Sequence, residues 1–94
     1  MEKVLVLQQQ GKWVISVVNE EDDEILFLTS DGKFGAWHGG RNSGGFDTWK
    51  INLDMPQNPP DENEALKLLM KAHSAISSGN ALRIKYCPYC QPID

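Results

Sequence analysis

The sequence predicts an α+β protein with a mainly antiparallel sheet of about five to six strands and one helix packed on one face of it. Three observations predict this class. Short apolar or alternating segments separated by turn residues fill residues 1–54, a segment with helical spacing occupies residues 61–78, and a last apolar strand follows at residues 82–86. Strands that precede a helix, without regular βαβ alternation, are typical of this class. A chain of 94 residues has the length of a single domain.

The predicted strands of the first part follow one another along the chain. A short apolar run at residues 4–7 ends in the polar turn QQQG. Residues 13–18 are apolar at both sets of alternate positions, which favours a strand with a neighbour on each side. Residues 25–29 and 34–38 flank an Asp-Gly pair, whose residues accept the positive φ angles of a tight type I′ turn. These segments therefore predict a series of hairpins.

The fifth predicted strand, residues 46–53, alternates between apolar and polar side chains, so one of its faces is expected to be exposed. Its apolar face holds Trp49, Ile51 and Leu53, and its polar face holds Thr48, Lys50 and Asn52. The segment MPQNPP at residues 55–60 contains three prolines, which neither a sheet ladder nor a helix interior accommodates. This segment is expected to be the loop that crosses over to the helix.

The helix of residues 61–78 has recognisable signals at both ends. Asp61 is placed to cap its N-terminus, with Glu64 three residues later as in a capping box. Gly79 suits the left-handed position that follows a helix C-terminus. The apolar stripe is expected to contain Leu66, Leu69, His73 and Ile76, with Ala65, Met70 and Ala72 beside them. In the last strand, Leu82, Ile84 and Tyr86 are expected to face the core.

Charge and hydropathy exclude some classes of function. The chain carries nine basic and thirteen acidic residues, a net charge of −4, and so lacks the basic footprint that binding of a phosphate backbone requires. Nucleic acid is therefore not expected as a direct ligand. No apolar run approaches the roughly 20 residues of a membrane span, and the N-terminal apolar run is too short for a signal-peptide core. These features predict a cytoplasmic protein without a membrane partner.

Both cysteines lie in the segment CPYC, at Cys87 and Cys90, directly after the last predicted strand. These four letters match the active-site motif of glutaredoxins, in which a helix N-terminus activates the first cysteine. Only four residues follow Cys90, so no such helix is expected here. A strand that ends in Cys-Pro-x-Cys also resembles the zinc knuckle of rubredoxins and zinc ribbons. The same arrangement resembles the tails of many small phage-encoded and bacterial proteins of unknown function.

The resemblance to a zinc knuckle implies a bound Zn²⁺ with Cys87 and Cys90 as two of its ligands. Tetrahedral zinc needs four ligands. His38, at the end of a predicted strand, is the candidate third ligand, and His73 on the helix would complete a Cys₂His₂ set. A symmetric homodimer, with two cysteines from each chain, is the second alternative. The third is a pair of cysteines that binds no metal.

The segment WHGGRNSGGFDTW at residues 37–49 contains four glycines close together. One interpretation is a plain connection between two hairpin strands. The other is a recognition loop, because tryptophan and arginine are enriched in binding hot spots and glycine lets a backbone approach a partner closely. Arg41 would also suit a small anionic ligand. The candidate binding residues are Trp37, His38, Gly39, Gly40, Arg41, Asn42, Gly44 and Gly45.

An uninterrupted acidic run lies at the predicted hairpin tip before the third strand. Its members are Glu20, Glu21, Asp22, Asp23 and Glu24. The run has no spacing of the calcium-loop type and no glycine for the sharp turn of such a loop. It is interpreted either as a solvated hairpin tip or as an acidic surface for a basic partner.

These observations lead to three hypotheses of function. No catalytic constellation is recognisable, which predicts a protein that is not an enzyme. The first hypothesis is a small protein-interaction module, and the phage-like tail suggests a phage accessory protein that inhibits a host or defence protein in the host cytoplasm. The second is a zinc-stabilised structural or nucleic-acid-associated module that uses the CPYC segment. The third is a binder of a small anionic ligand through the glycine-rich loop.

Overall fold

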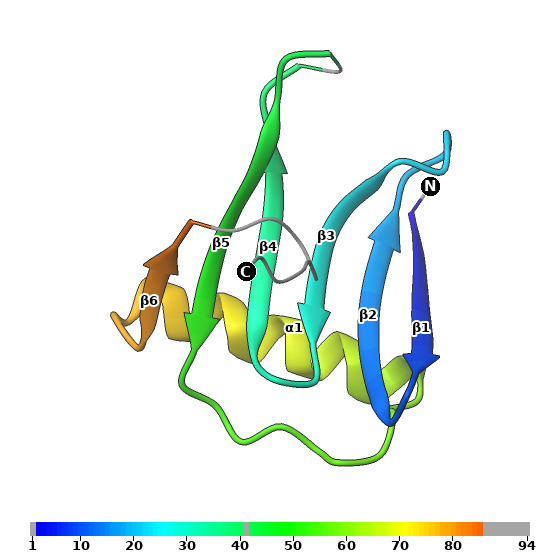
Figure 1. The fold of residues 1–94 in the computed structure, drawn as a ribbon, viewed down its shortest axis with the longest axis vertical. Coiled ribbons are helices and arrows are strands. Elements are labelled where there is room, and N and C mark those ends of the chain that lie inside the picture. Colours follow the sequence, from blue (N-terminus) through cyan, green and yellow to red (C-terminus); the bar gives the residue numbers. More distant parts are fainter. Residues whose placement is uncertain (1, 41, 86–94) are drawn as a thin grey trace.

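The computed structural model describes residues 2–40 and 42–85. These residues form one six-stranded antiparallel sheet, in which the strands lie in the order of the sequence, and one helix on one face of the sheet (Figure 1). The strands are β1 (Lys3–Gln9), β2 (Lys12–Val18), β3 (Glu24–Thr29), β4 (Lys33–His38), β5 (Gly45–Ile51) and β6 (Ala81–Ile84), and the helix is α1 (Glu62–Ser77). The predicted α+β class is confirmed.

Two of the hairpin turns show how local chemistry selects the turn type. Gln10 and Gly11 join β1 to β2, and their φ angles of 53° and 80° are the two positive values that a type I′ turn requires. The type I′ prediction for the Asp-Gly pair between β3 and β4 is wrong. Only Gly32 has a positive φ there, at 87°, and its N–H donates to the carbonyl oxygen of Thr29 at 3.0 Å. The connection is a three-residue loop with a glycine bulge.

The side chain of Thr29 explains the conformation of this loop. Its hydroxyl donates to the carboxylate of Asp31 and accepts from the N–H of Lys33 at 3.0 Å, so it joins both sides of the turn. Partial burial raises the pKa of Asp31, but this hydrogen bond and the nearby charge of Lys33 outweigh the burial and hold the pKa below its usual value. The carboxylate is thereby kept ionised in the turn.

Both predicted ends of α1 are confirmed. The carboxylate of Asp61 accepts from the N–H of Glu64 at 2.9 Å, which satisfies one of the free donors of the first turn. At the C-terminal end, the N–H of Asn80 donates to Ala75 at 2.7 Å and the N–H of Gly79 donates to Ile76 at 3.2 Å. With Gly79 at a φ of 84°, these two bonds are those of a Schellman motif.

The buried stripe of α1 is rotated from the predicted one. The side chains that face the sheet are Ala65, Leu68, Leu69, Ala72 and Ala75. Leu66 and His73 are exposed, and Met70 is 71% exposed, although all three were expected on the apolar stripe. The predicted stripe was centred on the large apolar side chains. The helix instead turns its three alanines towards the sheet, because their small side chains let the helix axis approach the sheet more closely than leucine would.

The core lies between α1 and the face of the sheet formed by alternate residues of the strands. Trp13 and Ile15 of β2, Leu28 of β3 and Phe34 of β4 are fully or almost fully buried there. The indole N–H of Trp13 donates to the carbonyl oxygen of Pro56 at 3.1 Å. This bond ties the crossover loop, which leads into α1, to the second strand of the sheet.

The opposite face of the sheet is also partly buried. Phe27 is fully buried on it, and its ring lies over Gly35, where a Cβ atom would collide with the ring. Thr48, predicted on an exposed polar face, is only 2% exposed, and its hydroxyl has no hydrogen-bond partner among the described residues. The alternation of β5 therefore gave the correct two faces but the wrong environment for Thr48.

The prediction for the last strand is wrong in its orientation. Leu82 and Ile84 were expected to face the core, but they pair with Lys50 and Thr48 on the face away from α1, and Leu82 is 69% exposed. Ala81 packs against the core in their place. The guanidinium of Arg83 lies 5.4 Å from the ring centre of Trp49 on the same side as α1. Tyr86 lies outside the described residues.

We predict that Gly35→Ala destabilises the protein by about 1–3 kcal/mol, because the new methyl group would overlap the buried ring of Phe27. The measurement is the free energy of unfolding in urea. Gly45→Ala is the matched control in the neighbouring strand, since a Cβ atom at Gly45 meets nothing within 4 Å. Equal stability of the two variants would contradict the contact between Phe27 and Gly35.

We further predict that Thr48→Val stabilises the protein by about 1 kcal/mol, because a methyl group of the same shape replaces a buried hydroxyl for which the described residues provide no hydrogen-bond partner. Thr29→Val is the matched control, since this buried hydroxyl has two partners, and it is expected to destabilise by about 1–3 kcal/mol. Urea unfolding of both variants is the measurement. A loss of stability in Thr48→Val would show that the hydroxyl is satisfied.

Candidate functional site

Two hairpin tips lie at the same end of the sheet, where the connections β2–β3 and β4–β5 project (Figure 1). In a sheet whose strands follow sequence order, alternate turns lie at alternate ends. The acidic run and the glycine-rich loop, which are separated by a whole hairpin in the sequence, are therefore at one end. The helix crosses the strands nearer to their other end (Figure 1).

Between these two tips, β3 and β4 are paired over a short distance only. Their register joins Leu26, Phe27 and Leu28 to Ala36, Gly35 and Phe34, and it stops after the Leu26–Ala36 pair. The register of β2 with β3 shifts at the same level, because Val17 pairs with Leu26 whereas Val18 pairs with Glu24. Ile25 is the extra residue of this β-bulge. A bulge bends its strand and increases the local twist, which accounts for the separation of β3 from β4.

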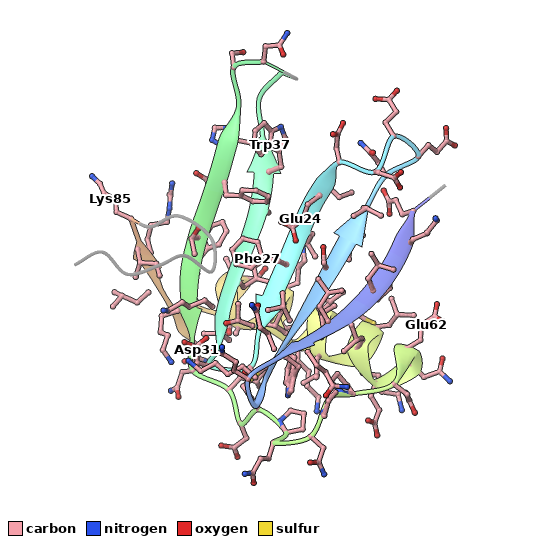
Figure 2. The ribbon with its side chains drawn as sticks, turned by 45° about the vertical axis from the view of Figure 1, so that its right-hand side comes forward. Glu24, Phe27, Asp31, Trp37, Glu62 and Lys85 are labelled. Carbon is pink, nitrogen blue, oxygen red and sulfur yellow. The ribbon has the colours of Figure 1, made fainter. Side chains whose placement is uncertain are left out.

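The separation opens a cleft of about 500 Å³ on the molecular surface. The described residues that line it come from the β2–β3 hairpin and from the facing ends of β4 and β5: Asn19, Glu21, Asp23, Glu24, Ile25, Trp37 and Phe46. Figure 2 shows Glu24 on β3 and Trp37 on the neighbouring strand β4, towards the same end of the sheet. The cleft thus contains part of each candidate surface predicted from the sequence, namely three of the acidic residues and Trp37.

One wall of the cleft is aromatic. The rings of Trp37 and Phe46 meet edge to face with their centres 5.2 Å apart, and Phe46 meets Phe27 in the same way at 5.2 Å. Edge-to-face contacts of this kind hold aromatic rings in fixed orientations. The indole of Trp37 lies against Gly44, where a Cβ atom would be 2.6 Å from Cζ2 of the ring. Trp37 nevertheless remains 37% exposed.

The other wall is the acidic turn, whose shape is set by Asn19. The side-chain oxygen of Asn19 accepts from the N–H groups of Glu21 at 2.9 Å and Asp23 at 3.0 Å. The backbone N–H of Asn19 donates to the carbonyl oxygen of Asp23 at 3.0 Å, and Asp22 takes a positive φ of 62°. These bonds make a closed turn. Of the five predicted acidic residues, the turn places Glu21, Asp23 and Glu24 along the cleft.

Glu24 is anchored at the base of this wall. Its Oε2 atom accepts from the hydroxyl of Ser16 at 2.6 Å, a short distance that is typical of a charge-assisted bond. Ser16 itself is buried on β2. One carboxylate of the cleft is thus fixed by the sheet, whereas Glu21 and Asp23 belong to the turn above it.

The predicted glycine-rich site is divided by the alternation of β4. Trp37 lines the cleft, whereas His38 points to the side of the sheet that carries α1. There its Nε2 atom lies 3.3 Å from Asp47, whose carboxylate also accepts from Arg83 at 2.7 Å. Gly39, Gly40 and Asn42 belong to the tip of the hairpin and Gly45 begins β5, and none of these four lines the cleft. Arg41 lies outside the described residues.

The predicted metal site is not tested by this arrangement. Cys87 and Cys90 lie outside the described residues. Within residues 2–40 and 42–85, no group of three or more histidine, cysteine, aspartate or glutamate side chains could hold a metal ion. His38 is 66% exposed at its side chain and interacts with Asp47. Zinc binding through the CPYC segment stays a prediction.

Three lining residues were missed by the sequence analysis. Asn19 could have been found, because asparagine before an acidic turn is a common source of side-chain-to-backbone bonds. Phe46 and Ile25 could not, because an alternating apolar pattern does not distinguish a cleft wall from a core.

Comparison of the chain with protein-family models, with curated proteins and with solved structures gave no match. In the described part of the chain, no helix has the length and apolar character needed to cross a membrane.

We predict that Gly44→Ala displaces the indole of Trp37, because the added methyl group would overlap the ring and the carbonyl oxygen of His38. The expected result is a shifted indole N–H signal of Trp37 in a ¹H–¹⁵N spectrum and a loss of about 1–3 kcal/mol in the free energy of unfolding. Gly40→Ala, in the same loop, is the control, since its Cβ atom would meet only the Ser43 hydroxyl at 3.4 Å. An unchanged Trp37 signal in Gly44→Ala would contradict the contact.

Proposed function

We propose that this protein is a small protein-interaction module whose binding site is the cleft between the β2–β3 and β4–β5 hairpins. The observation that supports the proposal most strongly is the exposed indole of Trp37, held in a fixed orientation by Phe46 and Gly44 beside an acidic turn of defined shape. Tryptophan is one of the three residue types in which interface hot spots are enriched. A ring that is already ordered also loses little conformational entropy when a partner binds.

The charge of the cleft argues against a small anionic ligand there. Glu21, Asp23 and Glu24 would repel an anion, and Arg41, the residue on which the anionic-ligand hypothesis depended, is not among the described residues. A cleft lined by aromatic and acidic side chains suits a protein segment that offers apolar and basic groups. We therefore favour the protein-binding hypothesis over the ligand-binding one.

The role of a non-enzymatic module in a phage, as an inhibitor of a host or defence protein, stays a prediction. It depends on the resemblance of the CPYC tail, which lies outside the described residues. The same holds for the zinc-stabilised alternative. Neither changes the proposed location of the binding surface.

The proposal predicts that peptides selected for binding lose affinity when Trp37 is replaced. The experiment is a selection of random displayed peptides on the immobilised protein, followed by calorimetric titration of the synthesised peptides. Trp37→Ala is expected to weaken binding by at least about 30-fold, the loss typical of a hot-spot tryptophan. Circular dichroism and thermal unfolding of the variant establish that it is folded.

Met70→Ala is the matched control, because Met70 is the most exposed large apolar side chain of the helix and does not line the cleft. It should leave the affinity of the same peptides unchanged. Selected peptides that bind Trp37→Ala as tightly as the unmodified protein, or that lose affinity with Met70→Ala, would place the binding surface elsewhere. A selection that enriches no binding peptide would count against the interaction role as well.

A further inference from the structure

The described lining of the cleft is negatively charged on one side and apolar on the other. Its described residues include three carboxylates, those of Glu21, Asp23 and Glu24, and no lysine or arginine. Opposite them lie the apolar surfaces of Ile25, Trp37 and Phe46. A site of this composition presents an aromatic wall and an acidic wall to the same occupant.

Aromatic and acidic surfaces attract different parts of a long cationic side chain. The face of an indole ring attracts a guanidinium or ammonium group that lies within about 6 Å of its centre. The methylene stem of arginine or lysine packs on apolar surface, while the charged end reaches for carboxylates. A divalent metal ion would instead require several convergent oxygen ligands, and aromatic side chains provide no ligand atoms for it.

The existing bonds of the acidic wall are compatible with such an occupant. The hydroxyl of Ser16 donates to Glu24 and holds this carboxylate at the edge of the cleft. The backbone N–H of Asp23 donates to the side chain of Asn19, and this bond fixes the position of Asp23 in the turn. The residue Asp23 is exposed. Negative charge from three carboxylates at a half-enclosed surface remains attractive to a cation even when each oxygen has another partner.

The molecule itself repeats the guanidinium–indole contact elsewhere. Arg83 lies 5.4 Å from the ring centre of Trp49 and donates to Asp47 at 2.7 Å, so one guanidinium there contacts an indole and a carboxylate together. Trp37 with Glu24 and Asp23 offers the same two groups, in a cleft with room for a side chain from another molecule. The internal example has the same pair of groups, an indole and a carboxylate, around one guanidinium.

We infer that the cleft is a specificity pocket for an arginine or lysine side chain of the partner protein, with the cationic group between Trp37 and the carboxylates of Asp23 and Glu24. This inference rests on the proposed function and adds the chemistry of the partner to it. Arginine is the preferred occupant, because its planar guanidinium stacks on an indole and bonds a carboxylate through two N–H groups at once.

The test uses three peptides that differ at one central residue: Gly-Leu-Arg-Leu-Gly, the same peptide with citrulline, and the same peptide with leucine, all blocked at both ends. Citrulline has the shape of arginine without its charge. Binding is followed by ¹H–¹⁵N spectra of the protein, with the indole N–H of Trp37 and the backbone N–H of Asp23 as reporters. The arginine peptide is expected to shift both signals, with an affinity at least about tenfold above that of the citrulline peptide.

Two matched charge variants locate the effect. Asp23→Asn removes one negative charge inside the cleft and is expected to weaken the arginine peptide about two- to fivefold, with a smaller response to added salt. Asp54→Asn makes the same change on an exposed residue of the crossover loop, which does not line the cleft, and should leave the affinity unchanged. Trp37→Leu keeps an apolar wall but removes the indole, so it should weaken the arginine peptide more than the leucine peptide.

Equal affinity of the arginine and citrulline peptides overturns the inference, as do shifts confined to residues outside the cleft or no shift with any peptide. These outcomes are separate from those that test the proposed function. Selected peptides that depend on Trp37 but carry no basic residue would support the interaction site and refute the specificity for a cation. Selected peptides that do not depend on Trp37 would refute both.

Discussion

One helix must cover a sheet of six strands, and this constraint shapes the whole protein. A helix of 16 residues is about 24 Å long, which is about the width of six strands spaced 4.8 Å apart. Lying across the strands, α1 therefore reaches every part of the width but only a band about 10 Å high (Figure 1). The bond from the indole of Trp13 to Pro56 holds the incoming loop against β2, so the band lies at one end of the strands. The helix leaves uncovered the other end, where the β2–β3 and β4–β5 hairpins project.

Glycine and aromatic residues organise what the helix does not reach. On the face away from α1, the ring of Phe27 lies over Gly35 and the indole of Trp37 lies against Gly44. Phe46 stands between the two rings and touches both edge to face. Gly35 and Gly44 are required because they have no side chain: a methyl group at either position would overlap an aromatic ring. The same row of rings that closes the sheet surface ends as the wall of the cleft.

The cleft itself comes from an irregularity in the sheet. A regular ladder between β3 and β4 would have paired Ile25 with Trp37 and left no opening. The bulge at Val17 and Val18 adds one residue to β3, turns the end of that strand away and ends its pairing with β4 after Leu26. Backbone geometry thus keeps the acidic turn and the indole apart, and the cleft lies between them.

The sequence alone determined what depends on neighbouring residues. The order of the elements, the Asp61 cap, the left-handed Gly79 and the hairpin connections all follow from interactions within a few residues, and the structure agrees with them. The type of the β3–β4 turn was missed because the hydroxyl of Thr29 bonds across it, which a propensity for Asp-Gly does not include.

Only the tertiary structure decided which side of each element is buried and which residues meet. Apolar residues occupy both faces of β2, and alternation gives two sets of residues without saying which set a helix will cover. Three features were decided in this way: the rotation of α1 towards its alanines, the outward position of Leu82 and the burial of Thr48. The cleft joins Asp23 to Trp37 across a bulge, and the Asp47–Arg83 bond joins residues 36 apart. Such contacts depend on how whole strands are placed against one another, because no local pattern records the partner of a side chain.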